Sequence, residues 1–367
     1  MSTSICYVHD WIVQIAGAER VLIELLKFRP ADLFTLFCSE KAVNELKRRT
    51  YTNLSINTSF LQKLPGIQKV YKSLLPAFPV AIESLNVSKY NIIFSLSHAI
   101  AKGVRKSNDQ IHICYCHTPM RYIWHLYQNY YEYGNILQKL GLRAFKKYLQ
   151  TWDKKTSKNV DVFLVPSTAV RERVRKIYGR DSFVVPPPVD TELFSPSYEK
   201  EDYFLFVGRL DIPYKKVDIV VNAFNLLNEK LIVVGDGKDL EKLKRIAKSN
   251  IEFVGWKSGK QLVEYMARAR ALIIPSEEDF GLVAVESQAC GTPVIAYGKG
   301  GCIDTVKDGK TGILFYEQTV DSLVAAVRRF IILEDQFKLE EIRKNSLKFS
   351  RENFRQKINN ILCNVTK

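Results

Sequence analysis

The chain has 367 residues, of which 46% are hydrophobic and 25% charged, and its formal net charge is +15 at pH 7. This length suits two domains better than one, and the apolar content is enough for two cores. No uncharged run approaches the roughly 20 residues of a membrane span, and residues 1–10 lack the basic start and apolar stretch of a signal peptide. We therefore expect a cytoplasmic protein rather than an integral membrane or secreted one.

The positive charge is concentrated in the first half of the chain. Residues 1–190 contain 27 Lys and Arg against 14 Asp and Glu, whereas residues 191–367 contain 27 against 25. The partner of the first half is therefore expected to be anionic, and phosphorylated lipid, an acidic membrane surface and nucleic acid all have that charge. Because no nucleic-acid-binding motif accompanies the charge, we do not expect nucleic acid. A peripheral contact with the inner face of an anionic membrane stays open.

Short apolar runs alternate with amphipathic stretches through the first half. The runs that predict strands are Ile5–Val8, Leu33–Phe37, Ile92–Phe94, Ile111–Tyr115 and Val162–Val165. Such an alternation is typical of a parallel sheet covered by helices. Gly17 stands where the helix after the first run should begin, so its backbone amide could hold a phosphate, although a glycine after a strand is most often only a turn.

Two histidines follow predicted strands of this half. His98 lies shortly after the third run and His117 follows the fourth. At the end of a strand an imidazole can donate to a sugar hydroxyl or orient an acceptor, although a lone histidine is more often structural. The residues after His117 add a cation and aromatic faces that could contact an acceptor, namely Arg121, Tyr122 and Trp124.

An apolar stripe with basic neighbours comes next. Its members recur at helical spacing and are Leu142, Phe145, Leu149 and Trp152. A helix that lies at a membrane interface would look like this. A domain-packing helix with a solvated basic face looks the same, and we favour that interpretation.

The alternation breaks at Val184–Asp190, where three consecutive prolines exclude regular structure, and then resumes. The predicted strands that follow are Phe204–Val207, Leu231–Val234, Ile251–Phe253, Ala271–Ile274 and Val294–Ala296. We therefore expect two doubly wound α/β domains, residues 1–190 and 191–348, that face each other across a cleft in which ligands bind beyond the strand ends. Apolar spacing in residues 349–367 predicts a last helix that packs back on the first domain.

Two cations stand near the start of the second domain. Arg209 follows its first predicted strand, and Lys215 lies close to the next helix start. A guanidinium fork and an ammonium group beside a helix N-terminus suit a diphosphate and can neutralise the charge that grows as it leaves. Two surface cations at a strand end would give the same pattern.

Glycine loops follow two later strands, at Gly235–Gly237 and at Gly298–Gly301. Each could let the backbone approach a phosphate or a base closely. Glycine after a strand is most often only a turn, so neither loop is specific by itself.

Two glutamates flank a predicted strand-to-helix turn. Glu278 follows the apolar run that ends at Pro275, and Glu286 lies on the helix that should open at Phe280-Gly281. Glu286 could accept hydrogen bonds from the diol of a ribose, while Glu278, on the loop, lies nearer the group being transferred. Both could instead be solvated surface charges, as most glutamates are.

The sequence gives no sign of a metal site or of a disulfide framework. No Asp-X-Asp pair follows a strand and the five histidines lack ligand spacing, so no metal is expected. The seven cysteines are scattered and odd in number, which predicts reduced core thiols.

Taken in order, these motifs resemble those of the retaining glycosyltransferases of family 4, whose GT-B architecture consists of two facing Rossmann-like domains. The resemblance covers nearly the whole chain and rests on Gly208-Arg-Leu with Lys215, Glu278-Asp-Phe-Gly with Glu286, Ala289-Cys-Gly-Thr-Pro-Val294, and Gly300-Gly301 before Asp308-Gly-Lys-Thr-Gly312. It implies an enzyme whose only co-substrate is a nucleotide sugar, with no further cofactor.

The resemblance also implies roles for single residues. Arg209 and Lys215 would bind the donor diphosphate and Glu286 the ribose, while Glu278 and the Phe280 and Gly281 amides would bind the donor sugar. We also assign to donor binding Gly17, Gly235, Trp256 and Leu282.

A narrower resemblance is to bacterial surface-polysaccharide mannosyltransferases. It rests on Leu74-Leu-Pro-Ala-Phe-Pro79, Ser95-Leu-Ser-His-Ala-Ile-Ala-Lys-Gly103 and Cys116-His-Thr-Pro-Met-Arg-Tyr122. It implies GDP-mannose as donor and His117 beside the sugar; we expect a saccharide or lipid-linked acceptor, with His98 among the residues that bind it. Two departures stand out. The family's Gly-Gly-Glu-Arg reads Gly17-Ala-Glu-Arg20 here, and the loop from Arg209 to Lys215 is one residue longer than in the family.

Three alternatives stay open. Nucleotide-sugar epimerases share the two-domain fold, and a UDP-sugar could replace GDP-mannose as donor. A noncatalytic anion-binding protein would also explain the basic first half.

Overall fold

The computed structural model describes residues 4–50, 53–134, 136–197 and 199–365, which fall into two compact units. Unit 1 comprises the described residues up to Pro187 and those from Phe354 on, and unit 2 is Pro188–Asn353. The first boundary lies close to residue 190, where the proline run interrupts the sequence pattern. The second lies inside the last helix, so that the chain returns to unit 1 along one continuous element.

Unit 1 contains a seven-stranded parallel sheet in the order β3-β2-β1-β4-β5-β6-β7. Its strands are β1 (Ile5–His9), β2 (Asp32–Thr35), β3 (Ile56–Thr58), β4 (Ile92–Ser97), β5 (Ile111–Cys116), β6 (Val162–Val165) and β7 (Phe183–Val184). Sequence periodicity did not predict β3 and β7, because these edge strands are very short and β3 carries the polar Asn57 and Thr58.

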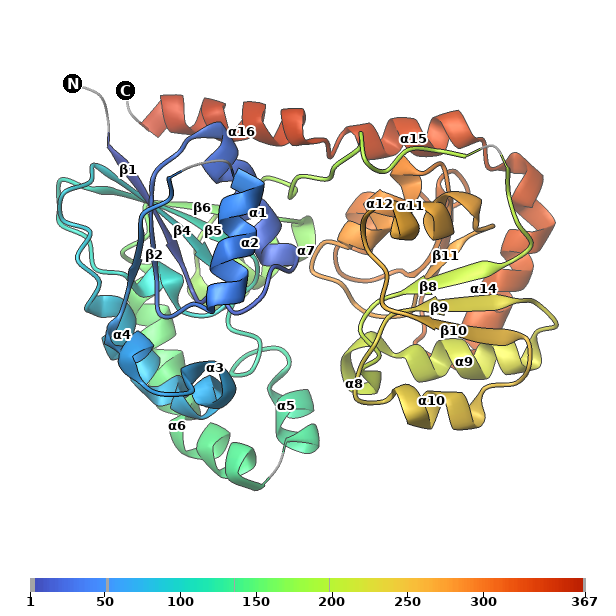
Figure 1. Cartoon of the computed structure of the whole chain (residues 1–367), viewed down its shortest axis with the longest axis horizontal. Coiled ribbons are helices and arrows are strands. Elements are labelled where there is room, and N and C mark those ends of the chain that lie inside the picture. The colour runs from blue at the N-terminus through green and yellow to red at the C-terminus, as the bar shows by residue number, and fades with distance from the viewer. Residues whose placement is uncertain (1–3, 51–52, 135, 198, 366–367) are drawn as a thin grey trace. The chain divides into compact units, whose positions relative to one another are not determined.

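Helices cover both faces of this sheet (Figure 1). Besides the last helix, the helices of unit 1 are α1 (Gly17–Phe28), α2 (Glu40–Thr50), α3 (Ile67–Val70), α4 (Phe78–Glu83), α5 (Tyr127–Tyr133), α6 (Ile136–Ser157) and α7 (Thr168–Tyr178), with the 3-10 turns η1 (Phe60–Lys63), η2 (Tyr71–Ala77) and η3 (Ala101–Gly103). Of these, α5 has no buried residue and does not cover the sheet. Residues along β1 alternate between the two layers, since Cys6 and Val8 join one core cluster and Tyr7 joins the other. A strand buried on both faces needs an unbroken apolar run, and this is the pattern that the sequence shows.

The last helix, α16 (Arg351–Val365), packs in the core of unit 1 along its apolar side. Phe354, Ile358 and Leu362 are at most 3% exposed, and the Phe354 ring lies edge-on to Tyr115 at 6.3 Å between centroids. The helical spacing of these residues therefore corresponds to one buried stripe.

Unit 2 repeats the architecture with six parallel strands in the order β10-β9-β8-β11-β12-β13. The strands are β8 (Phe204–Val207), β9 (Leu231–Val234), β10 (Ile251–Gly255), β11 (Leu272–Ile274), β12 (Val294–Tyr297) and β13 (Gly312–Phe315). The helices are α8 (Ile212–Lys215), α9 (Val217–Leu226), α10 (Leu240–Ile246), α11 (Gly259–Arg268), α12 (Leu282–Ala289), α13 (Cys302–Thr305), α14 (Val320–Leu333) and α15 (Leu339–Leu347), and η4 (Glu334–Gln336) follows α14.

The chain's thiols are all free. Five are buried, as predicted, namely Cys6, Cys114, Cys116, Cys290 and Cys302. The prediction of core thiols is wrong for Cys363, which is exposed because it lies on the outer side of α16, and Cys38 is half-buried.

The apolar stripe of α6 divides into a buried and an exposed half. Leu149 and Trp152 are 2% and 9% exposed, whereas Phe145 is 42% exposed. Earlier in the helix Ile136 and Leu140 are 69% and 58% exposed. The domain-packing interpretation is therefore confirmed for the carboxyl-terminal half of α6 only. Among the described residues, no helix is both long and apolar enough to cross a bilayer.

A buried ion pair fastens α6 to the rest of unit 1. Lys102 Nζ lies 2.5 Å from Asp153 Oδ1, and the two side chains are 1% and 0% exposed. The other carboxylate oxygen, Oδ2, accepts from Trp124 Nε1 at 2.7 Å and from the Tyr178 hydroxyl at 2.8 Å. The network therefore joins η3, α6 and α7 through one carboxylate.

Replacing Lys102 with Met should lower the free energy of unfolding by about 3 kcal/mol, because it leaves the Asp153 charge buried without its cation. Urea denaturation followed by far-ultraviolet circular dichroism measures the change. Arg105→Met is the matched control: Arg105 pairs with Glu83 at 2.8 Å but is 73% exposed, so its loss should cost less than about 1 kcal/mol. Equal costs for the two variants would contradict this account.

Candidate functional site

The sheet of unit 2 reverses its strand order between β8 and β11. From β8 the chain proceeds outward through β9 to β10, and from β11 it proceeds the other way to β13. In open α/β sheets, ligands bind beyond the carboxyl ends of the strands at such a reversal. The segment after β8 contains Arg209 and Lys215, and the segment after β11 contains Glu278.

Lys215 and Glu278 meet across this reversal. Lys215 Nζ donates to Glu278 Oε1 at 2.7 Å, and the Ser276 hydroxyl donates to the same oxygen at 2.5 Å. The two charged side chains are 31% and 22% exposed. Burial by itself raises the pKa of the Glu278 carboxyl, but the Lys215 ammonium and these two hydrogen bonds outweigh it and hold that pKa below its usual value. Glu278 is therefore a partly buried carboxylate that stays ionised.

The backbone turn that delivers Lys215 differs from the one expected. Pro213 lies in a short helix, α8, and Lys215 is its last residue rather than part of the start of a longer helix. Lys216 then adopts φ 52°, the only positive φ of a residue other than glycine within the described ranges, and α9 begins after it. A left-handed residue that is not glycine is uncommon and costs conformational energy, so the turn is held by its surroundings.

The loop between β12 and α13 braces the Glu278 segment. The Gly301 amide donates to the Glu278 carbonyl at 2.7 Å. A Cβ atom at Gly300 would lie 2.3 Å from that carbonyl oxygen, and one at Gly301 would lie 2.3 Å from Phe280 Cα. Gly300 and Gly301 therefore approach the backbone of the site loop closely, while their approach to a phosphate or a base stays a prediction.

The loop after β9 braces the Arg209 segment in the same way. A Cβ atom at Gly235 would lie 1.9 Å from the Gly208 carbonyl oxygen, and the Leu210 amide donates to the Asp236 carbonyl at 2.9 Å. Arg209 itself is exposed, and its side chain makes no hydrogen bond or ion pair with the part of the chain that the structure describes. The structure thus leaves the guanidinium available, while its convergence with Lys215 on one anion stays a prediction.

The remaining donor candidates differ in exposure. Glu286 is 1% exposed on the inner side of α12, and Trp256, just after β10, is 71% exposed. Gly281 caps α12 with φ 86°, directly before Leu282, and Phe280 is 5% exposed and packs edge-on against Phe349 at 5.5 Å. The alternative that Glu278 and Glu286 are solvated surface charges is therefore wrong.

Unit 1 has an equivalent reversal between β1 and β4, and its histidines lie there. His98 follows β4 and His117 follows β5. His98 Nδ1 is 2.9 Å from a carboxylate oxygen of Asp10, the residue after β1. Sequence reasoning missed Asp10, although an acid at the end of the first predicted strand was a usable signal.

His117 is a neutral imidazole. Burial, followed by the nearby charges of His98 and His9, lowers the pKa of His117 to about 3. Its Nε2 has no hydrogen-bond partner among the described residues, and its ring lies edge-on to Tyr115 at 5.0 Å. A buried nitrogen without a partner suits a ligand hydroxyl, as expected for a residue beside a sugar.

The predicted acceptor residues after His117 are only partly available. Arg121 is exposed, but Tyr122 and Trp124 pack against the core of unit 1. The Trp124 indole is already bound to Asp153, and Lys154 Nζ lies 5.2 Å from the centre of its ring. Gly17 is the first residue of α1, where the Ala16 amide donates to Glu19 Oε2 at 2.8 Å.

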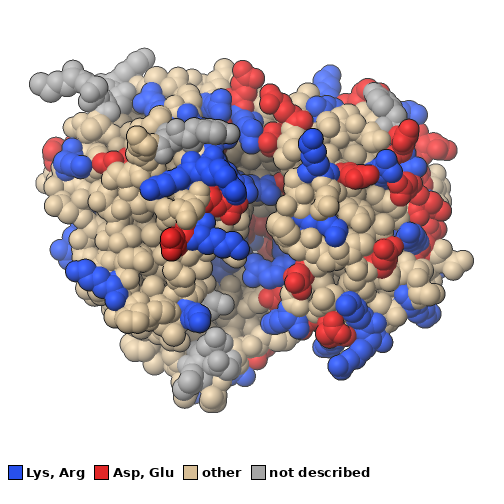
Figure 2. All heavy atoms as spheres, in the orientation of Figure 1, with Lys and Arg blue, Asp and Glu red and all other residues tan. Residues whose placement is uncertain are grey.

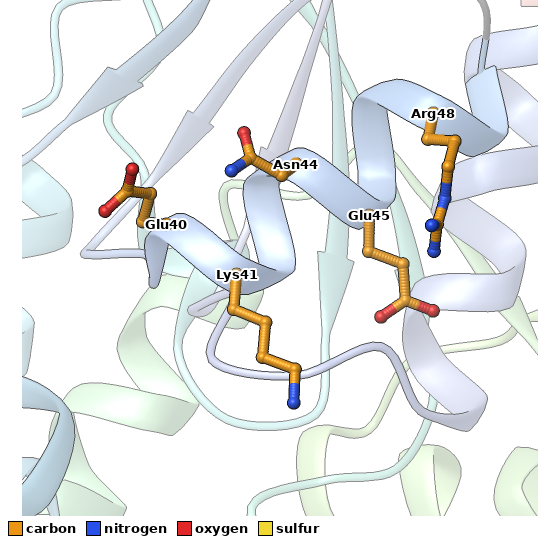
Figure 3. A pocket seen from close by; sticks show the side chains of 5 residues that line it. All are labelled: Glu40, Lys41, Asn44, Glu45 and Arg48. Carbon is orange, nitrogen blue, oxygen red and sulfur yellow. The ribbon is translucent and has the colours of Figure 1, made fainter.

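A surface hollow beside α2 does not qualify as a site. Figure 3 shows that its lining side chains all come from this one helix, namely Glu40, Lys41, Asn44, Glu45 and Arg48. They lie at no strand reversal, and Glu45 is already paired with Arg49. Nor do the described residues include a group of three or more His, Cys, Asp or Glu placed to hold a metal ion.

Two families match the chain in sequence. "Glycosyltransferase Family 4" matches residues 15–193, and "Glycosyl transferases group 1" matches residues 190–349. Together they cover residues 15–349, which include the strand reversal of unit 2 and the candidate site residues described above except Asp10; β1 and Asp10 precede the first match. The chain belongs to glycosyltransferase family 4.

Several curated relatives of this family 4 chain match part of it. An uncharacterized glycosyltransferase of Methanocaldococcus jannaschii is 32% identical over 57% of this chain and 59% of its own length. A D-inositol 3-phosphate glycosyltransferase of Nocardiopsis dassonvillei is 33% identical over 43% and 45%. A GDP-mannose-dependent alpha-(1-6)-phosphatidylinositol monomannoside mannosyltransferase of Mycolicibacterium smegmatis is 30% identical over 46% and 52%. The chain thus spans about half the length of the relatives it matches.

A solved structure extends the likeness to the whole chain. Anabaena HepE in complex with UDP is 18% identical, covers 99% of this chain and 100% of its own, and superposes with a TM-score of 0.72. At this identity the likeness concerns the fold, which is GT-B with two Rossmann-like domains.

The bracing of Glu278 by Gly300 can be tested with a matched glycine pair. Gly300 and Gly309 both have φ +72°, but a Cβ atom would meet the Glu278 carbonyl only at Gly300, whereas nothing lies within 4 Å at Gly309. Gly309→Ala should therefore cost only the left-handed strain of about 1–2 kcal/mol. Gly300→Ala should cost more and also reduce turnover, because the Glu278 backbone must move; denaturation and initial rates measure both. Equal losses would refute the bracing role.

Proposed function

We propose that this chain is a retaining glycosyltransferase that moves a hexose, mannose from GDP-mannose, to a saccharide or lipid-linked saccharide acceptor during the synthesis of a cell-surface polysaccharide. The observation that carries the proposal is the Lys215–Glu278 pair at 2.7 Å. It joins the two family motifs at the point of the sheet where α/β proteins bind ligands. Family membership supports the reaction class, and the mannosyltransferase among the relatives supports the donor.

The pair can serve both parts of the donor. An ammonium group has three N–H donors, so Lys215 can keep its hydrogen bond to Glu278 and still donate one to a phosphoryl oxygen. Arg209, exposed and without a side-chain partner among the described residues, adds a guanidinium that binds phosphate with two parallel hydrogen bonds. Glu278, held by Ser276 and Lys215, orients the hydroxyls of the sugar. These cations neutralise the departing diphosphate, so the proposed reaction uses a nucleotide sugar as co-substrate and no other cofactor.

The proposed step keeps the anomeric configuration. The bond from the anomeric carbon to the diphosphate oxygen breaks while the acceptor oxygen forms its bond on the same face. The acceptor proton passes to the leaving phosphate, whose growing charge Arg209 and Lys215 stabilise. His117, a neutral imidazole with a free buried nitrogen, hydrogen-bonds a sugar hydroxyl.

The basic charge of unit 1 supports an anionic acceptor environment. Figure 2 shows Lys and Arg prominent among the charged side chains on the visible face of unit 1, whereas acidic and basic side chains mingle on unit 2. The exposed half of α6 adds Ile136 and Leu140, one turn apart, beside Lys139 and Arg143. Apolar side chains flanked by cations suit the surface of an anionic bilayer, so we place the reaction at the inner face of the membrane.

One assay tests the function. The protein is incubated, with a chelator present, with a panel of GDP-, UDP- and other nucleotide sugars and lipid-linked acceptors, and products are identified by mass. Mannosylated acceptor from GDP-mannose is the expected product. Consumption of donor with formation of an epimer and no acceptor product would identify an epimerase, transfer from a UDP-sugar would overturn the donor, and salt-sensitive lipid binding without turnover would leave an anion-binding protein.

Removing either cation of the donor site should cost on the order of 10²-fold or more in kcat, since each acts on charge that develops in the transition state. The variants are Arg209→Ala and Lys215→Met. The matched control is Lys230→Met, because Lys230 pairs with Glu252 at 3.6 Å, is 53% exposed and directly precedes β9, at the opposite end of the strands from the candidate site. Near-normal turnover of Arg209→Ala would refute its role.

The membrane contact can be tested without turnover. The double variant Ile136→Ser, Leu140→Ser should bind vesicles of anionic phospholipid at least about tenfold more weakly than the parent, since two apolar side chains no longer enter the interface. Cosedimentation measures binding. Ile332→Ser is the control, because Ile332 is 81% exposed on α14 of unit 2. Equal binding of parent and double variant would place the contact elsewhere.

A further inference from the structure

Asp10 is an unusual carboxylate at the strand reversal of unit 1. It is 0% exposed, yet it lies at the end of β1 beside the segment that follows β4. Its two oxygens accept from four consecutive backbone amides, those of residues 98–101, at 2.6 to 3.0 Å. A buried carboxylate that accepts this many hydrogen bonds is stabilised as the anion. One side chain therefore fixes the whole turn that carries His98.

The same carboxylate also lies against the His98 ring. Nδ1 of His98 is 2.9 Å from Asp10 Oδ2, a close charge contact that lacks hydrogen-bond geometry, and Trp11 packs edge-on to the ring at 4.7 Å between centroids. Because Nδ1 faces Asp10, the ring nitrogen available to a ligand is Nε2, and the His98 side chain is 27% exposed. A carboxylate this close to an imidazole stabilises its protonated form, while the packing of Trp11 restricts its orientation.

The charged surroundings of His98 come from three other elements. Glu19 projects from α1, His9 ends β1 with its ring 6.0 Å from that of His98, and His117 and Arg121 follow β5. Burial lowers the pKa of His98, but Asp10, with a smaller contribution from Glu19, outweighs burial and Arg121 and raises it above the usual value. Its neighbours His9 and His117 have lowered pKa values. Of these three histidines, His98 is therefore the one whose protonated form the surroundings favour.

We propose that Asp10 is a positioning residue that holds the His98 imidazolium at the carboxyl edge of the unit 1 sheet, where Nε2 donates a hydrogen bond to an oxygen of the acceptor substrate. The arrangement commits one nitrogen to the protein and presents the other as a charged donor. It suits a hydroxyl or phosphoryl oxygen, and it leaves neutral His117 to contact the donor sugar. The kinetic part of this inference rests on the proposed glycosyl transfer, whereas the charge state of His98 does not.

The sign of the pH dependence follows from the raised pKa. A donor imidazolium is present below that pKa and is lost as pH rises through it, so acceptor binding should weaken on the alkaline side. Asp10→Asn removes the anion that raises the pKa and should move the loss to lower pH. If His98 acted as a general base, the pH dependence would have the opposite direction, and turnover would increase as the pH rises.

The charge state is measured by NMR titration of the imidazole carbon-bound protons in the full chain, with His98 assigned from His98→Gln. We expect His98 to titrate above the ordinary value of about 6.5 and to titrate lower in Asp10→Asn. The matched control is Glu24→Gln, since Glu24 is also a buried acid of unit 1 and pairs with Arg355 at 2.5 Å. It should reduce stability without moving the His98 midpoint.

The role in the reaction is measured by the pH dependence of the acceptor KM. In the parent, the acceptor KM should increase as the pH is raised through the His98 midpoint. In Asp10→Asn this increase should occur at lower pH, and in Glu24→Gln it should occur at the same pH as in the parent. A His98 midpoint at or below the ordinary value overturns the inference, and so does turnover that increases through that midpoint. If no sugar is transferred at all, the proposed function fails while the NMR titration still decides the Asp10–His98 pair. If Asp10→Asn does not fold, the parent titration and His98→Gln decide it.

Discussion

The ion pair between Lys215 and Glu278 is the interaction around which the candidate site of unit 2 is built. Its two residues lie far apart in the sequence and meet because β8 and β11 are neighbours at the strand reversal. Parallel strands end at the same edge of a sheet, so the segments that follow them converge there whatever their sequence separation. The pair also favours a charged site, because burial alone would raise the pKa of the Glu278 carboxyl, whereas Lys215 and the hydrogen bonds hold that pKa below its usual value.

Unit 1 places a comparable pair at its own reversal. Asp10 and His98 follow β1 and β4, and again an acid and a cation from adjacent strands meet at the carboxyl edge. The two pairs differ in burial. Asp10 is fully buried and accepts hydrogen bonds from four backbone amides, so it stabilises the turn of residues 98–101. Glu278 is 22% exposed and can contact a ligand. The same topology therefore yields a supporting carboxylate in one unit and a candidate catalytic one in the other.

The sequence predicted most strands of the two buried parallel sheets and missed short elements that depend on tertiary contacts. It also missed β13 (Gly312–Phe315), although that strand is fully buried. Runs such as Leu231–Val234 are apolar throughout because they are covered on both faces, and each became a strand. The edge strand β7 has only two residues, and α8 is a single turn that ends at a left-handed Lys216. Neither has a periodic pattern, since a strand or helix this short is stabilised by its neighbours rather than by its own residues.

The candidate site shows the same division. Motif spacing indicated Lys215 and Glu278, and the fold brings them together. It also predicted that glycines approach a ligand, which stays a prediction, and it did not predict that Gly235 and Gly300 allow backbone segments to pack at distances that a Cβ atom would block. Asp10 was missed although it directly follows the first predicted strand; what the sequence could not show is that its partners are the backbone amides of residues 98–101, since nearly every residue carries an amide donor.

This bracing explains why a site formed by loops can be precise. The Gly301 amide and the Gly300 contact fix the Glu278 backbone, while Ser276 and Lys215 fix its carboxylate. Rotation about the side chain would break two hydrogen bonds at once, and movement of the loop would break a third. Electrostatic stabilisation of a departing diphosphate requires that the charges be in place beforehand, because charges that reorient during the reaction stabilise it less. Gly300 and Gly301 therefore contribute to the precision of the site through the close backbone contacts that they permit.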